Sequence, residues 1–143
     1  MSLTNPILHG FNPDPSIIRV KDDYYIATST FEWFPGVQIH HSKDLKNWDL
    51  ITRPLDRVSL LDLKGVPDSC GVCAPCLSYD NGTFYLVYSC VKSFDGMWKD
   101  TPNYLTTTKN INGPWSEPIC LCNTKGDVAR FFFLKIVTND FLE

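Results

Sequence analysis

A β-hairpin is predicted by the stretch Leu77-Ser78-Tyr79-Asp80-Asn81-Gly82-Thr83-Phe84-Tyr85-Leu86-Val87-Tyr88-Ser89. Its central Asn-Gly pair readily supplies the positive φ angles that a type I′ turn requires. The aromatic and β-branched residues after the turn favour a strand, and they lack the i, i+3, i+4, i+7 spacing of an amphipathic helix. The stretch therefore predicts two antiparallel strands joined at residues 80–82.

Short apolar or aromatic runs bounded by turn residues recur along the chain. They predict strands at Ser16–Val20, Tyr24–Ser29, Val37–His41, Thr83–Ser89 and Tyr104–Thr107. Lys21-Asp22-Asp23 is a second turn, placed before Tyr24 as Asn-Gly is placed before Phe84. No helical pattern precedes Lys125. The chain is therefore expected to be all-β.

Each group of strands closes on a tryptophan-bearing turn. Trp48 ends the first unit and Trp115, 67 residues later, ends the second. Repeated units of about four short strands are typical of the blades of a β-propeller. Four such blades need at least about 260 residues, so about two blades are expected here, as an open fragment. We interpret both tryptophans as packing residues.

Composition excludes several classes of function. The net charge of −3 and the pI near 5.5 provide no basic surface for nucleic acid or anionic membranes. The N-terminal residues contain neither a signal peptide nor a membrane span, so we expect a cytoplasmic protein. Its six cysteines are then expected to be reduced thiols.

A candidate site lies in the first 36 residues. Asp14 stands between Pro13 and Pro15, which predicts a carboxylate held in a rigid, extended turn. The alternative is that Asp14 is only a turn residue. Phe31, Trp33 and the neighbouring Phe34 follow a predicted strand and could stack on a sugar ring, or could all belong to the core.

Eight motifs along the chain follow the order of a known family. They are Asn5–Leu8, Gly10–Ile17, Asp22–Gly36, His40–Leu45, Pro67–Ser69, Ala74–Tyr79, Trp98–Asp100 and Gly113–Pro118. Together they resemble the opening of the family 43 β-xylosidases. The resemblance implies a five-bladed β-propeller and inverting removal of terminal xylose or arabinose from xylo-oligosaccharides. It also implies that Asp14 is the general base, whereas the general acid is a Glu beyond residue 143.

The chain departs from the family pattern at three places. Cys73 stands where the family has a tryptophan, which predicts an altered sugar pocket. Asp127 matches only weakly the second Asp of the family, which orients the acid. We therefore expect residues 1–143 to be the N-terminal part of the propeller domain, family-like to about residue 121, with a divergent tail at 122–143.

Two other functional classes stay open. One is a catalytically inactive truncated chain, and the other is a metal module built on Cys70, Cys73 and Cys76, whose spacing suits zinc or an iron–sulfur cluster. His9, His40 and His41 show no metal-ligand spacing with carboxylates, and His40 and His41 should face opposite sides of one strand. We expect neither a metal nor another cofactor, and a full-length form that can be homo-oligomeric.

Overall fold

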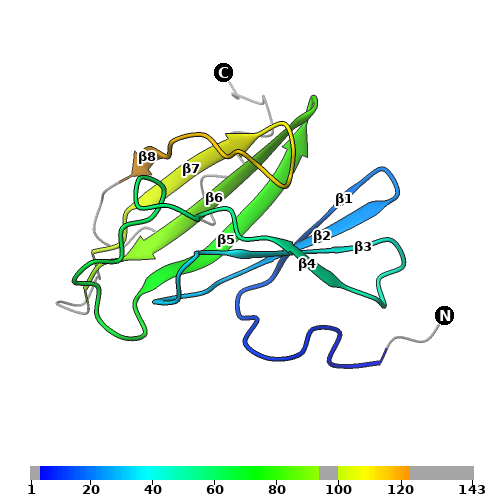
Figure 1. Cartoon of the computed structure of the whole chain (residues 1–143), viewed down its shortest axis with the longest axis horizontal. Coiled ribbons are helices and arrows are strands. Elements are labelled where there is room, and N and C mark those ends of the chain that lie inside the picture. The colour runs from blue at the N-terminus through cyan, green and yellow to red at the C-terminus, as the bar shows by residue number, and fades with distance from the viewer. Residues whose placement is uncertain (1–3, 94–99, 123–143) are drawn as a thin grey trace, which may run out of the picture.

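The fold is known from a computed structural model, which describes residues 4–93 and 100–122. Its strands are β1 (Ser16–Val20), β2 (Asp23–Thr28), β3 (Gln38–Ser42), β4 (Asp49–Thr52), β5 (Gly71–Asp80), β6 (Thr83–Val91), β7 (Asn103–Thr108) and β8 (Ile119–Cys122). They form two four-stranded antiparallel meanders, β1-β2-β3-β4 and β5-β6-β7-β8 (Figure 1). The prediction of an all-β chain with two blade-like units is confirmed. None of the described residues belongs to a helix that could cross a membrane.

Residues with positive φ angles form the tight turns of the β1–β2 and β5–β6 hairpins. Asn81 and Gly82 have φ angles of 45° and 82°, and Asp80 pairs with Thr83 across them. In the first sheet, Lys21 has a φ of 57° between paired residues Val20 and Asp23. Both tight turns are as predicted, because positive φ angles match the twist of the strands that they join.

Three stretches with no strand pattern in the sequence are strands in the structure. They are β4, β8 and the first half of β5, where Pro75 interrupts the pattern. β4 and β8 each contain only four residues and form one edge of their sheets. Short edge strands carry a weak local signal, because pairing with a neighbour decides their conformation.

The register of the first two strands of each sheet repeats with an offset of 60 residues. Ser16 pairs with Ala27 and Ile17 with Ile26 in the first sheet. Cys76 pairs with Val87 and Leu77 with Leu86 in the second sheet. The two sheets are thus copies of one unit, as the spacing of the tryptophans suggested.

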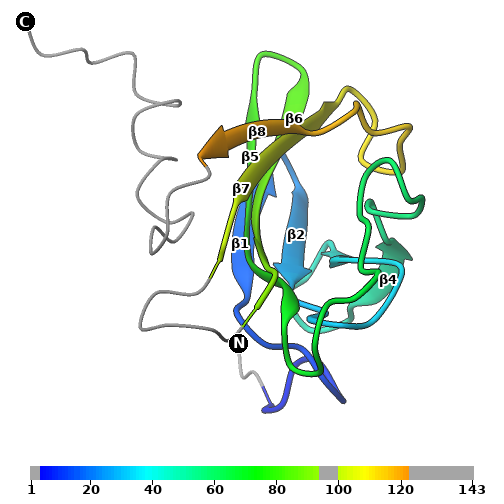
Figure 2. The same cartoon turned by 90° about the vertical axis from the view of Figure 1, so that its left-hand side faces the viewer.

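The hydrophobic core lies between the two sheets, which are seen from two directions in Figures 1 and 2. The rings of Tyr25 on β2 and Phe84 on β6 meet edge to face, with centroids 5.6 Å apart. Leu55, Leu60 and Leu61, from the connection between β4 and β5, complete the buried cluster. Burial of these side chains is the main force that joins the sheets.

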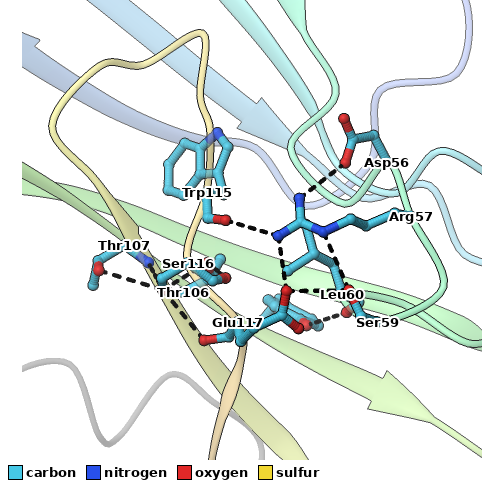
Figure 3. A network of polar contacts seen from close by, with 10 residues as sticks. Asp56, Arg57, Ser59, Leu60, Thr106, Thr107, Trp115, Ser116 and Glu117 are labelled. Carbon is cyan, nitrogen blue, oxygen red and sulfur yellow. Dashed lines mark hydrogen bonds and ion pairs between the residues drawn. The ribbon is translucent and has the colours of Figure 1, made fainter.

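A polar network ties the β4–β5 connection to the second sheet (Figure 3). Arg57 Nη2 donates to the carbonyl oxygen of Trp115 at 3.1 Å and to Glu117 Oε1 at 2.9 Å. Ser59 Oγ also donates to Glu117 Oε1, at 3.2 Å. Trp115 is buried in the core, as the packing interpretation predicted. Trp48 is half-buried, and its indole Nε1 donates to the carbonyl oxygen of Leu45.

Candidate active site

Asp14 lies two residues before β1 and is half-buried where three elements meet. Its Oδ2 accepts a hydrogen bond of 2.7 Å from Ser29 Oγ, at the end of β2. The backbone N–H of Ala74, within β5, contacts the same oxygen at 3.3 Å and Ser29 Oγ at 2.9 Å. The carboxylate is thus held by both sheets, and in the described part of the chain these hydrogen bonds fall on Oδ2 rather than Oδ1.

The backbone at Asp14 differs from the prediction. We expected an extended residue, because proline disfavours the right-handed helical region at the position before it. The φ of Asp14 is instead 51°, in the left-handed region. Aspartate tolerates this region better than most residues. The hydrogen bond from Ser29 N to the carbonyl oxygen of Pro13, at 2.9 Å, holds the turn in place.

The second sheet offers a direct comparison for this turn. Ala74 occupies the position 60 residues after Asp14, also precedes a proline, and also has a positive φ, of 48°. Alanine therefore adopts the same backbone geometry at a position that has no carboxylate. The turn alone does not require an acid at position 14, which weakens the interpretation of Asp14 as a turn residue.

A close backbone contact brings the end of β2 against β5. Phe31 N donates to Val72 O at 2.8 Å, and Val72 N donates to Phe31 O at 3.0 Å. Gly71 makes this approach possible, because a Cβ there would lie 2.3 Å from Phe31 O. Its φ of 92° also favours glycine. This contact brings Phe31 to the strand that carries Ala74.

The aromatic residues after β2 do not all belong to the core. Trp33 and Phe34 are 64% and 49% exposed, so the alternative that they belong to the core is wrong, whereas Phe31 is half-buried. A cavity of about 530 Å³ is lined by Phe11, Phe31, Glu32, Trp33 and Ser69. The structure thus brings the two predicted sugar-stacking residues, Phe31 and Trp33, to one hollow.

Besides Asp14, the candidate carboxylates are Asp127 and, as alternative bases, Glu32, Asp68 and Asp95. Asp127, the predicted second catalytic residue, lies outside the described residues, as does Asp95. Asp68 is exposed and does not line the cavity, whereas Glu32 lines it. Sequence reasoning did not identify Ser29 or the Ala74 N–H as groups that hold Asp14. The sequence signal that could have pointed to Ala74 is its place 60 residues after Asp14, at the equivalent position of the second repeat.

The described cysteines and histidines do not gather into a metal site. Within residues 4–93 and 100–122, no three His, Cys, Asp or Glu side chains are grouped as a metal site requires. His41 Nε2 lies 2.6 Å from Asp23 Oδ1, whereas the neighbouring His40 is buried. The two histidines therefore face opposite sides of β3, as predicted.

Two repeated meanders with a carboxylate held before the first strand define part of a propeller protein with a candidate acid–base site. The chain belongs to the glycosyl hydrolases family 43, whose model matches residues 3–131. This family has a five-bladed β-propeller fold, which is present here in part.

Curated relatives and solved structures agree with this assignment. The chain is 64% identical over 127 residues to xylosidase/arabinosidase 43B of Humicola insolens, covering 89% of this chain and 24% of the relative. It is 64% identical over 131 residues to the β-xylosidase of Bacillus subtilis, covering 92% of this chain and 25% of the relative. The crystal structure of xylan β-1,4-xylosidase from Bacillus halodurans superposes with a TM-score of 0.83 at 63% identity, covering 85% of this chain and 23% of that one. The chain thus spans about a quarter of the length of these relatives.

Proposed function

We propose that the chain is the N-terminal part of a propeller domain that hydrolyses terminal xylose or arabinose from xylo-oligosaccharides with inversion, and that Asp14 is its general base. The observation that carries the proposal is the anchoring of Asp14 Oδ2 by Ser29 Oγ and Ala74 N. A carboxylate held at one oxygen presents the other in a defined direction. Oδ1 is then the atom that accepts a proton from the attacking water.

The internal repeat supports a chemical role for this side chain. The same turn is made with alanine in the second sheet, at Ala74. A half-buried carboxylate at Asp14 is therefore not explained by backbone geometry. Partial burial of a charged group is costly unless it is hydrogen-bonded, and such an arrangement is common where the charge has a function.

The substrate class follows from the relatives and from the exposed rings. The relatives named above are a xylosidase/arabinosidase and a β-xylosidase. Phe31 and Trp33 line one cavity, and aromatic rings can pack against the C–H faces of a pyranose. We propose that these two residues contact the sugar. Cys73, where the family pattern has a tryptophan, is half-buried on β5 and does not line this cavity.

Inverting hydrolysis requires a second carboxyl group about 6.5–9.5 Å from the base, which leaves room for the water. We propose that a Glu encoded after residue 143 is this acid, and that Asp127 orients it. Asp14 by itself supplies only the activation of water. The chain of 143 residues is then one part of a catalytic pair.

The test uses a chimaera in which residues 1–121 are followed by the remaining part of the Bacillus subtilis β-xylosidase. Release of xylose from xylobiose is measured for the chimaera and its variants. Asp14→Asn should lower kcat by several orders of magnitude with KM little changed, because the water loses its base. Asp22→Asn is the matched control, since that side chain is 95% exposed in the Lys21–Asp22 turn.

Activity that Asp14→Asn leaves unchanged would contradict the assignment of Asp14. The base would then be sought at Glu32, which lines the aromatic cavity, and next at Asp68 and Asp95. A chimaera that folds but does not hydrolyse xylobiose would favour the alternative of a catalytically inactive chain, for which the replacement at Cys73 is the argument.

A further inference from the structure

Both sheets contribute to the wall of the cavity of about 530 Å³ that holds the aromatic residues after β2. Its lining consists of Phe11, Phe31, Glu32, Trp33 and Ser69. Phe31 pairs with Val72 of β5, and Ser69 lies two residues before that strand, so the cavity adjoins the second sheet. Asp14 does not line it. Within the described part of the chain, Glu32 is the one charged side chain of this lining.

The fold does not use the Glu32 carboxylate. Among residues 4–93 and 100–122, this carboxylate has neither an ion pair nor a hydrogen-bond partner. Backbone groups hold the turn around it, because Trp33 N donates to Thr30 O at 2.9 Å and Phe31 N donates to Val72 O at 2.8 Å. Glu32 is nevertheless half-buried. Partial burial of a carboxylate without hydrogen bonds is unfavourable, so a ligand that donates hydrogen bonds would stabilise it.

The rings and the carboxylate together favour an uncharged ligand that carries hydroxyl groups. The C–H faces of a pyranose can pack against the rings of Phe31 and Trp33. An ionised carboxylate accepts hydrogen bonds through two oxygens, and these charge-assisted bonds are stronger than bonds between neutral groups. The described lining contains no Lys, Arg or His. A negatively charged ligand would therefore be repelled by Glu32 without a compensating cation.

We propose that Glu32 is a specificity-determining residue, which accepts hydrogen bonds from the hydroxyls of an oligosaccharide and disfavours an oligosaccharide with a carboxylate at this cavity. Because Asp14 does not line the cavity, the unit held here is a neighbour of the terminal sugar that is removed. The inference rests on the proposed function, in which Asp14 is the base and Glu32 is free to bind substrate. An uncharged unit is accepted at this position, and a uronic acid is selected against.

The test compares two trisaccharides that differ in a single carboxylate. Both are xylobiose with a side unit on the xylose that is not removed, and the side unit is glucose in one and glucuronic acid in the other. Their kcat/KM values are measured with the chimaera described above. At low ionic strength the chimaera should favour the glucose compound at least about fivefold, because like charges a few ångströms apart repel. This preference should shrink as salt is added.

Glu32→Gln keeps the shape of the side chain and removes its charge. The preference should then fall to near one, and KM for xylobiose should rise about tenfold with kcat little changed, because the charge-assisted hydrogen bonds are lost in the ground state and the transition state alike. Glu32→Asp should keep the preference. Asp22→Asn is the matched control and should also keep it, since it removes the same charge from a side chain that is 95% exposed at the other end of β1.

A binding measurement separates this inference from the proposed function. In calorimetric titrations, the Asp14→Asn chimaera should bind the glucose compound more tightly than the glucuronate compound, and adding Glu32→Gln should remove that difference. Hydrolysis that persists with Asp14→Asn would contradict the assignment of the base and leave the binding preference standing.

Four results would overturn the role of Glu32. They are equal kcat/KM values for the two compounds at low salt, a preference that Glu32→Gln retains, a preference that Asp22→Asn removes, and no binding of either compound to the chimaera. Where Glu32→Gln does not fold, the unaltered chimaera decides the question, because a preference that salt leaves unchanged does not come from the charge of Glu32.

Discussion

Ser29 Oγ donates a 2.7 Å hydrogen bond to Asp14 Oδ2 and accepts one of 2.9 Å from the N–H of Ala74. One hydroxyl therefore connects the end of β2 and the interior of β5 to the candidate base. Ser29 is fully buried, so no water can replace it without rearrangement. The orientation of Asp14 depends on this serine.

Replacing Ser29 by alanine tests that dependence. In the chimaera, Ser29→Ala should lower kcat for xylobiose about tenfold or more, because a misdirected base loses the advantage of fixed geometry. KM should change little, and Ser29→Thr, which keeps a hydroxyl, should recover part of the rate. Steady-state kinetics measure both constants. Equal kinetics for Ser29→Ala and the unaltered chimaera would show that this contact does not position the base.

The 143-residue chain alone should hydrolyse xylobiose very slowly. Asp14 can activate water, but departure of the leaving group needs a proton from a second carboxyl group. Xylose release should be measured by chromatography at high protein concentration, with the chimaera as the positive control. Turnover at rates typical of enzymes, unaffected by Asp14→Ala, would contradict both the pairing and the assignment of Asp14.

Gly71→Ala should destabilise the protein much more than Gly65→Ala. Both glycines have a positive φ, which costs an alanine roughly 1 kcal/mol. A Cβ at Gly71 would also lie 2.3 Å from Phe31 O, whereas one at Gly65 would have no neighbour within 4 Å. Denaturant unfolding should show an additional loss of about 1–3 kcal/mol at Gly71. Equal losses would mean that the backbone contact relaxes without cost.

Arg57→Ala should weaken the connection between the two sheets. The carbonyl oxygen of Trp115 loses its donor, at a cost of about 1–2 kcal/mol, and the pair with Glu117 is lost as well. The Tm should fall for Arg57→Ala and stay nearly constant for Arg19→Ala, whose ion pair with Asp22 is exposed. Calorimetry at neutral pH measures both.

The ion pair between Arg57 and Glu117 should make the stability of the protein depend on pH. Its hydrogen bond with Arg57 lowers the pKa of Glu117. A carboxyl group whose pKa is lower in the folded than in the unfolded protein stabilises the fold at pH values above its unfolded-state pKa. This stabilisation is lost as the pH falls through the folded-state pKa. The difference in Tm between Arg57→Ala and the unaltered protein should therefore shrink on acidification. A difference that grows toward low pH would contradict the contribution of Glu117.

The isolated chain should associate with itself. Ile17, Leu50 and Ile119 are 56%, 46% and 62% exposed on β1, β4 and β8, and each sheet ends in edge strands. Unpaired edges with apolar side chains promote pairing between chains. Light scattering should detect oligomers of the 143-residue chain and fewer of the chimaera. A sharply melting monomer would show that two blades suffice for an independent fold.

Several features of the site were predictable from the sequence and others were not. The Pro13-Asp14-Pro15 motif pointed to Asp14 as the candidate carboxylate, and the aromatic run pointed to Phe31 and Trp33; their roles stay predictions. Their surroundings were not predictable, because Ser29 and Ala74 reach Asp14 from 15 and 60 residues away. The backbone of Asp14 was predicted wrongly, since the backbone hydrogen bond from Ser29 N to Pro13 O outweighs the local preference that proline imposes.

The sequence by itself determined the hairpins, their turns and the repetition of one unit, because alternation, aromatic runs and pairs such as Asn81-Gly82 act between neighbours in the chain. Only the tertiary structure decided which residues meet between the sheets. Gly71 lets Phe31 approach β5, and that approach puts the Ala74 N–H against Asp14. Contacts between residues so far apart arise when apolar side chains of both sheets are buried together, and no local pattern encodes them.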